Sequence, residues 1–201
     1  MILALDTSSA IAVAVVSDAG DVLAARSVFD PRGHAEHLSA LVAEALEEAG
    51  ATGEVSRIVV GTGPAPFTGL RVGLMTARTL ATVWGVPVEG VCSLDAVGAA
   101  APGEVTVVAD ARRKEVYWAT YRDGARVSGP AVSAPADVPV LGSVLGRGAL
   151  LYPEAFPGAV GADPDPARLV EVAARLRAAG EPMPTEPLYL RRPDVHGVPG
   201  A

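Results

Sequence analysis

The sequence predicts an α/β protein built from two related halves, and three observations support this fold class. Three apolar, β-branched runs come first, at residues 2–5, 11–17 and 22–28, before any helical pattern. Helical and strand-like segments then alternate up to about residue 100, and three strand-like runs in series begin again at residue 105. Three strands followed by strand–helix units are the order of a ribonuclease H-like domain and not of a Rossmann domain. We therefore expect one domain over residues 1–100 and a reduced copy over residues 101–201.

The first half places its helices and strands in a regular order. The longest apolar stripe with helical spacing ends just before Gly50, which is placed for a C-terminal cap. Ser93 is the candidate N-cap of the last helix in this half. After the first three strands, we expect further strands over residues 57–60 and 86–91 and helices over residues 35–49, 70–84 and 93–100.

The second half repeats this start and then loses the pattern in sequence rich in proline and glycine. Residues 163–166, with two prolines after aspartates, are a credible start for one further helix over residues 167–179. The expected strands of this half lie over residues 105–109, 116–121, 126–133 and 188–191.

The composition favours a globular chain without its own affinity for nucleic acid. Half of the 201 residues are hydrophobic, and 16 basic against 23 acidic side chains give a net charge of -7. Contact with a phosphate backbone needs clustered Lys and Arg, so any nucleic-acid role is expected to depend on a partner. No run approaches the ~20 apolar residues of a membrane span and nothing indicates export, so we expect a cytoplasmic protein. Cys92 fits a small buried hydrophobe, and His34 and His37 have no third ligand in view, so no metal site is expected.

Residues 61–71 are the most unusual stretch of the chain. A strand, a Gly/Pro-rich turn and a helix in series place backbone N–H groups at a helix N-terminus, where anions bind. Two known phosphate motifs fail here, however. A P-loop needs a lysine, and the single lysine is Lys114; a dinucleotide fingerprint needs a glycine where this chain has Pro66. Spacing alone therefore does not distinguish a structural loop from an anion-binding site.

A carboxylate follows the first strand of each half. Asp6, with Thr7 and Ser8, follows the first run, and Asp110 takes the comparable place in the second half. Such groups could hold a metal and phosphate in a duplicated nucleotide fold, but the glycines that would admit phosphate are missing around Asp110. The alternative is an ordinary turn in which Asp6 and Thr7 bond local N–H groups. If these four residues form a site, it is a degenerate nucleotide site.

The expected helix over residues 70–84 has more apolar surface than one sheet face requires. Arg71, Arg78 and Thr82 form a narrow polar strip, and apolar residues cover most of the rest. Gly69 and Gly73 would let another helix approach closely. We infer a second packing partner, either the helix over residues 35–49 alone or a helix of another subunit.

Taken in order, several motifs resemble those of one family. The most specific is Phe67-Thr68-Gly69-Leu70-Arg71, and the others are residues 2–8, 34–36, 61–64, 72–73, 91–94, 110–112, 115–117 and 189–191. They resemble the TsaB family, also called YeaZ, over nearly the whole chain. One departure is that the family usually has Gly-Ser where this chain has Ala65-Pro66, and Pro66 has no N–H for an anion contact.

The resemblance implies an actin-like ATPase fold of two ribonuclease H-like domains and a role in making threonylcarbamoyladenosine beside the tRNA anticodon. It implies a non-catalytic partner of the paralogue TsaD, with the ATPase TsaE joining the complex and tRNA bound only through it. No cofactor is intrinsic, and ATP or ADP with magnesium is expected only in that complex. The implied partner surface is the helix pair of the first domain, with expected contact residues Leu38, Leu41, Val42, Gly69, Leu70, Gly73, Leu74 and Ala77.

Two enzymatic alternatives stay open at this point. One is a small phosphotransferase or nucleotide-binding enzyme of the actin-like superfamily that uses Asp6 and Asp110 around magnesium. The other is a glycoprotease-like peptidase, against which the missing metal pair counts. A helix pair whose partner-binding surface is uncovered also favours a homodimer through the same surface when the chain is alone. The sequence itself does not decide between homodimer and monomer.

Overall fold

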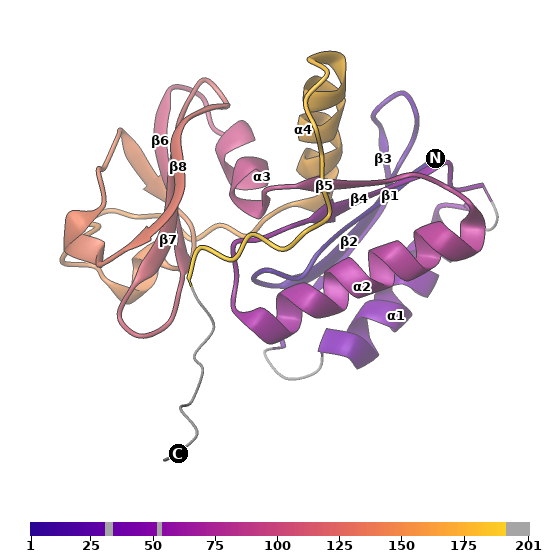
Figure 1. The fold of residues 1–201 in the computed structure, drawn as a ribbon, viewed down its shortest axis with the longest axis horizontal. Helices are drawn as coiled ribbons and strands as arrows, with labels where there is room; N and C mark the ends of the chain where they lie inside the picture. Colours follow the sequence, from indigo (N-terminus) through magenta and orange to yellow (C-terminus); the bar gives the residue numbers. More distant parts are fainter. Residues whose placement is uncertain (31–33, 52–53, 192–201) are drawn as a thin grey trace, which may run out of the picture.

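The computed structural model describes residues 1–30, 34–51 and 54–191, and its strands form two sheets that lie side by side (Figure 1). In the first sheet the strand order is β3-β2-β1-β4-β5. β2 pairs antiparallel with β1 and β3, whereas β1, β4 and β5 run parallel, which confirms the predicted ribonuclease H-like order. The strands are β1 (Ile2–Asp6), β2 (Ile11–Val16), β3 (Val22–Val28), β4 (Arg57–Gly61) and β5 (Val88–Val91).

The second sheet repeats the first in shortened form, with the order β8-β7-β6-β9. Three antiparallel strands again come first, and β9 pairs parallel with β6 as β4 does with β1. Among the described residues, a single parallel bridge from Leu145 to Val160 takes the place of β5 beside β9, so the copy is reduced, as expected. The strands are β6 (Glu104–Asp110), β7 (Val116–Arg122), β8 (Ala125–Ser133) and β9 (Ser143–Leu145), with two short 3-10 turns, η1 (Pro135–Asp137) and η2 (Ala149–Leu151).

Alternating side chains of the first sheet build two separate cores, one on each face. Leu3 and Leu5 belong to the core under α1 (His34–Glu48) and α2 (Phe67–Trp84). Ala4, between them, belongs to the opposite core under α4 (Pro166–Ala178), which also takes in the neighbouring α3 (Ser93–Ala99). Figure 1 shows α1 and α2 together on one side of this sheet and α4 on the other. The last described helix therefore packs on the first sheet, although the sequence assigns residues 101–201 to a second domain.

Most predicted elements are confirmed, and the differences have local causes. Asp165 caps α4, as its side chain accepts a hydrogen bond from the backbone N–H of Ala167. The predicted cap at Ser93 is wrong: Cys92 holds the N-cap position, and the Ser93 hydroxyl bonds Asp6 instead. The predicted strand over residues 188–191 is also wrong, because this segment makes one sheet-like bond, from the Leu188 N–H to the Thr62 carbonyl, and no strand. β9 escaped prediction because three residues are too few for an alternating pattern.

Candidate functional site

Asp6 lies at the end of β1, where three segments that are distant in the sequence meet. Its Oδ1 accepts hydrogen bonds from the Ser8 N–H (2.7 Å) and hydroxyl (2.6 Å), and its Oδ2 accepts one from the Ser93 hydroxyl (2.5 Å). The Ser93 oxygen in turn accepts the Gly63 N–H at 3.0 Å, so the carboxylate ties β1 to α3 and to the Gly/Pro loop. Gly61 leaves the room for this arrangement, because a Cβ there would lie 1.8 Å from the Asp6 Oδ2.

Burial dominates the electrostatics of this carboxyl group. Asp6 is 1% exposed, and the loss of hydration raises its pKa above the ordinary value of 3.8, against the opposing effect of the bonds from Ser8 and Ser93. The neighbouring Thr7 is equally enclosed, and its hydroxyl donates to the Gly69 carbonyl at 2.8 Å. Asp6 therefore bonds a local N–H group, as in the turn alternative, and also contacts α3, whereas Thr7 bonds the distant Gly69 carbonyl and not a local N–H group.

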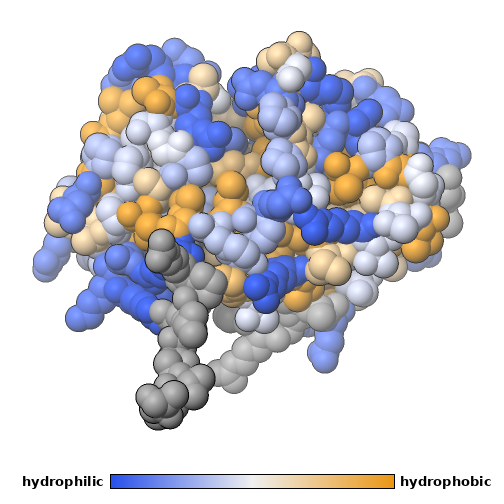
Figure 2. All heavy atoms as spheres, viewed as in Figure 1, coloured by the Kyte–Doolittle hydropathy of each residue, from blue (hydrophilic) through white to orange (hydrophobic). Residues whose placement is uncertain are grey.

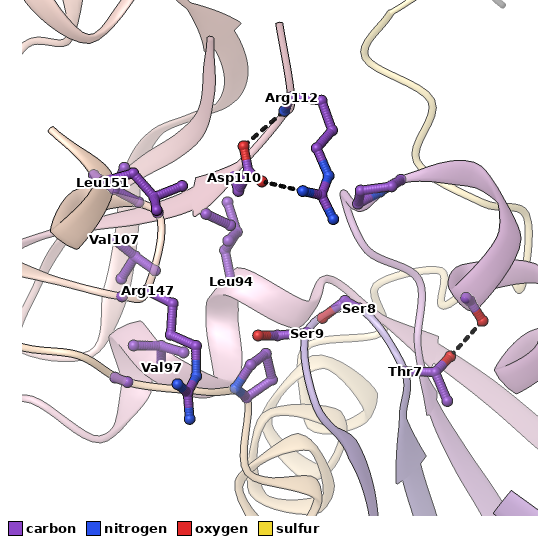
Figure 3. Close-up of a pocket in the computed structure, with 18 of the residues that line it drawn as sticks. Thr7, Ser8, Ser9, Leu94, Val97, Val107, Asp110, Arg112, Arg147 and Leu151 are labelled. Carbon is purple, nitrogen blue, oxygen red and sulfur yellow. Dashed lines mark hydrogen bonds and ion pairs between the residues drawn. The ribbon is translucent and has the colours of Figure 1, made fainter. Parts of the chain in front are cut away.

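A cavity of about 650 Å³ lies between the two sheets, and it brings three of the four predicted residues together (Figure 3). Thr7 and Ser8 line it from the first domain, and Asp110 lines it from the end of β6. Asp6 does not line it. The remaining lining combines apolar side chains with two arginines and includes Phe29, Phe67, Leu94, Val107, Arg112, Arg147 and Leu151.

The polar groups around this cavity are engaged with one another. The Arg112 guanidinium lies 3.3 Å from the Asp110 carboxylate, which also accepts the Arg112 N–H at 2.8 Å. Arg147 donates to both oxygens of Asp163 at 2.7 Å, and the same carboxylate accepts the Ser9 hydroxyl at 2.6 Å. Each arginine therefore already has a carboxylate partner, and in residues 1–30, 34–51 and 54–191 no group of three or more His, Cys, Asp or Glu side chains could hold a metal ion.

Sequence reasoning missed the segment that closes the cavity beside β6. Gly146 and Gly148 lie against this strand, where a Cβ would come within 2.2 Å of the Val108 carbonyl oxygen or 2.3 Å of the Ala109 carbonyl carbon. These glycines let the chain pack against the sheet backbone. They lie more than 30 residues from Asp110 in the sequence, so no local sequence motif predicts that they pack beside it.

The structure places most of the expected partner-contact residues inside the chain. Six of the eight are buried in or beside the core between the helix pair and the first sheet: Leu38, Val42, Leu70, Gly73, Leu74 and Ala77. Leu41 packs against the same core and Gly69 is half-buried. Their side chains contact the sheet of this chain, because the apolar stripe of a helix faces its own core first. The surface that α1 and α2 leave open consists of other residues.

α2 exposes three large apolar side chains, and two of them, Met75 and Val83, lie on its outer side. Met75 is 59% exposed, Val83 72% and Trp84 37%. Met75 and Val83 are eight residues apart with Thr79 midway, so they share one side of the helix. Figure 2 shows hydrophobic side chains interspersed with polar ones where Figure 1 places α2.

A C-terminal segment, residues 185–189, forms hydrogen bonds with the arginines of the polar strip of α2. Arg78 donates to the Thr185 hydroxyl (2.9 Å) and carbonyl (2.7 Å), and Arg71 donates to the Tyr189 hydroxyl (2.8 Å). The Tyr189 ring stacks on Phe67 with centroids 4.3 Å apart. The specific motif of residues 67–71 is thus held by residues more than 110 positions away.

Two further residues that the sequence singled out have structural roles. Burial raises the pKa of the Cys92 thiol to about 12, so the group is an unreactive, buried hydrophobe. His37 lies 3.0 Å from the Asp30 carboxylate. None of the described helices has the length and apolar content that a membrane span requires.

The comparisons with known proteins agree with this architecture. A family model described as "TsaD: tRNA N6-adenosine threonylcarbamoyltransferase" matches residues 30–149. A Mycobacterium tuberculosis protein is 45% identical over 199 residues, 96% of this chain and 93% of its own length. The Bacillus subtilis "tRNA threonylcarbamoyladenosine biosynthesis protein TsaB" is 32% identical over 126 residues, 60% of this chain and 55% of its own. The structure of YeaZ from Pseudomonas aeruginosa has a TM-score of 0.81 and 31% identity, and the match covers 94% of this chain and 99% of that one.

Two sheets of ribonuclease H-like order on either side of a cleft, the second one shortened, define a protein with the actin-like ATPase fold. Within that class, the chain belongs to the TsaB family, also called YeaZ.

Proposed function

We propose that this chain is a non-catalytic subunit in the biosynthesis of tRNA threonylcarbamoyladenosine and that it assembles with the transferase TsaD through the outer faces of α1 and α2. The observation that supports assembly is the exposed apolar side of α2. A helix that only covered its own sheet would not present Met75 and Val83 to solvent on one side. On the neighbouring α1, Glu44 and Glu47 are exposed, so a partner that covers both helices would fit with basic residues opposite α1.

The cleft supports the non-catalytic part of the proposal. Asp6 is buried and saturated by donors, and the Asp110 carboxylate is occupied by Arg112. Pro66 holds the N-cap position of α2 and offers no N–H to a phosphate. These features disfavour the phosphotransferase alternative, and the absence of a three-ligand cluster in the described residues disfavours the peptidase alternative.

The partner set follows from the same proposal. TsaE is the ATPase that joins the complex, tRNA is bound through the complex, and a homodimer through the α1–α2 surface forms when TsaD is absent. A cytoplasmic location remains a prediction of the sequence.

Assembly is tested by gel filtration with the cognate TsaD. Met75→Asp combined with Val83→Asp should abolish co-elution, because two charges would replace apolar contacts at the centre of the interface. Val140→Asp, at a residue 50% exposed in the second domain, is the matched control and should assemble normally. Circular dichroism should show native folding for all variants. Co-elution of the double variant at wild-type strength, or failure of the wild-type chain to co-elute, would contradict the proposal.

Nucleotide binding is tested separately on the isolated chain. Titration calorimetry with ATP and magnesium should show no binding up to about millimolar nucleotide, because both arginines that line the described cleft already pair with carboxylates. Micromolar binding would revive the enzymatic alternative with Asp6 and Asp110.

A further inference from the structure

Arg71 lies near the beginning of α2, and two aromatic rings hold its side chain in place. Its Nε–H donates to the Tyr189 hydroxyl at 2.8 Å. Its guanidinium carbon lies 4.8 Å from the centre of the Phe67 ring and 5.8 Å from the centre of the Tyr189 ring, and the two rings stack on each other. A guanidinium fixed in this way has already lost part of the rotamer freedom that a new contact would otherwise cost.

The same guanidinium has no carboxylate partner among the described residues. Most arginines in this part of the chain pair with an aspartate or a glutamate, among them Arg78, Arg112 and Arg147. Arg71 is exposed, and the bond to Tyr189 is its one hydrogen bond to a described residue, so neither terminal nitrogen has an acceptor there. Two adjacent nitrogens without acceptors form the fork that a carboxylate or a phosphate matches.

Arg71 adjoins the exposed apolar side of α2. Thr68 precedes it by three residues and Met75 follows it by four, so both are its neighbours on the helix surface, and both are exposed. The other charged residue of α2 is Arg78, which is bound to Thr185. A single unpaired cation beside apolar side chains suits one carboxylate at the rim of a protein interface, whereas a nucleic-acid backbone requires several clustered cations.

We propose that Arg71 binds an aspartate or glutamate side chain of TsaD at the rim of the α2 interface, and that Tyr189 is its positioning residue. The inference rests on the proposed function, which brings TsaD to this side of α2. The exposed Glu44 and Glu47 on α1 call for the opposite charge, so we expect a partner surface that is acidic opposite the start of α2 and basic opposite α1. This pattern selects one orientation of docking, because a rotated partner would place like charges together.

The test measures the affinity of the full chain for its cognate TsaD by titration calorimetry at several salt concentrations. Arg71→Gln should weaken binding roughly tenfold near 0.15 M salt, because it removes a hydrogen-bonded charge pair. The loss should shrink as the salt concentration rises, since salt screens a pair that only the wild type forms. Arg71→Lys keeps the charge without the fork and should recover part of the affinity.

The matched control is Arg168→Gln, which removes an exposed arginine of α4 on the opposite face of the first sheet. This variant should bind TsaD with wild-type affinity. Circular dichroism should show native folding for every variant.

A double-mutant cycle tests the role of Tyr189. Tyr189→Ala removes the ring and the hydroxyl that hold Arg71, and it should weaken TsaD binding roughly threefold in the wild-type background. Combined with Arg71→Gln it should cause no further loss, because a positioning residue has no effect once the group that it positions is gone. An equal further loss in the double variant would show that Tyr189 acts independently of Arg71 and would overturn its assigned role.

The remaining outcomes decide the role of Arg71. Weaker and less salt-dependent binding by Arg71→Gln supports the inference. Wild-type affinity in this variant, a loss that is the same at every salt concentration, or an equal loss in Arg168→Gln overturns it. Normal affinity for TsaD with weaker tRNA binding by the complex, or with a weaker homodimer of the isolated chain, shows that Arg71 contacts RNA or a second copy and also overturns it. Failure of the wild-type chain to bind TsaD is instead a failure of the proposed function.

Discussion

Leu74→Ala is expected to lower the free energy of unfolding by about 2 to 5 kcal/mol, whereas Met75→Ala should change it by less than about 1 kcal/mol. The two residues are neighbours on α2, but Leu74 is 3% exposed in the core above the first sheet and Met75 is 59% exposed. Truncation of Leu74 removes buried contacts and leaves a cavity, and truncation of Met75 mainly removes surface that water already reaches. Urea denaturation at neutral pH, followed by circular dichroism, measures both values.

This pair also separates stability from assembly. Leu74→Ala should weaken co-elution with TsaD only to the extent that the chain unfolds, whereas loss at Met75 should weaken co-elution in a chain of normal stability. Equal destabilisation by the two substitutions would show that α2 turns a different side toward the sheet.

The order of elements could be predicted because each long element carries its own signal. The apolar spacing from Leu38 to Ala49 defines a helix without reference to any other part of the chain, and β1 to β3 are recognisable as three β-branched runs. The same order repeated after residue 103 then predicts the second sheet. Periodicity cannot predict which part of the protein, or which other subunit, packs against an apolar helix face. It placed Leu38, Leu70 and Leu74 on one side of their helices, but whether that side meets the sheet or another subunit depends on tertiary packing.

The site was predictable only in its local parts. Asp6, Thr7 and Ser8 follow a strand, so their place at the sheet edge could be expected from the sequence. The donor that saturates Asp6 from α3 comes from Ser93, 87 residues further on, and the Tyr189 ring packs on Phe67 from the far end of the chain. Such contacts between distant segments have no signature within a single window of sequence.

Gly61→Ala is expected to destabilise the chain by about 3 kcal/mol or more, and Asp6→Ala by about 2 to 4 kcal/mol. A Cβ added at Gly61 would lie 1.8 Å from the Asp6 Oδ2 and 2.6 Å from the Ser93 Oγ, with the carboxylate enclosed and unable to move aside. Removal of the carboxylate leaves the Ser93 and Ser8 donors without their acceptor. In the double variant the vacated space accepts the added methyl group, so the total loss should be smaller than the sum by about 1 to 3 kcal/mol.

The control for this cycle is Gly98→Ala, whose Cβ would lie 2.4 Å from the Tyr121 ring and does not contact Asp6. Combined with Asp6→Ala, its effect should add to within about 0.5 kcal/mol in urea denaturation. Simple additivity of Gly61→Ala and Asp6→Ala would show that Gly61 does not make room for the carboxylate.

The pH dependence of the same variants tests the role of Asp6 itself. Burial raises its pKa in the folded chain above 3.8, so the folded state holds the proton more tightly than the unfolded state does. The stability that Asp6 contributes is therefore fully present below pH 3.8 and declines as the pH rises through the raised pKa. The deficit of Asp6→Ala relative to wild type should accordingly be larger in acid than at neutral pH, measured by urea denaturation across that range. A stability deficit of Asp6→Ala that grows with rising pH would mean that the folded chain prefers an ionised Asp6. A carboxylate that binds a cation requires this ionised form, so such a result would favour the enzymatic alternative.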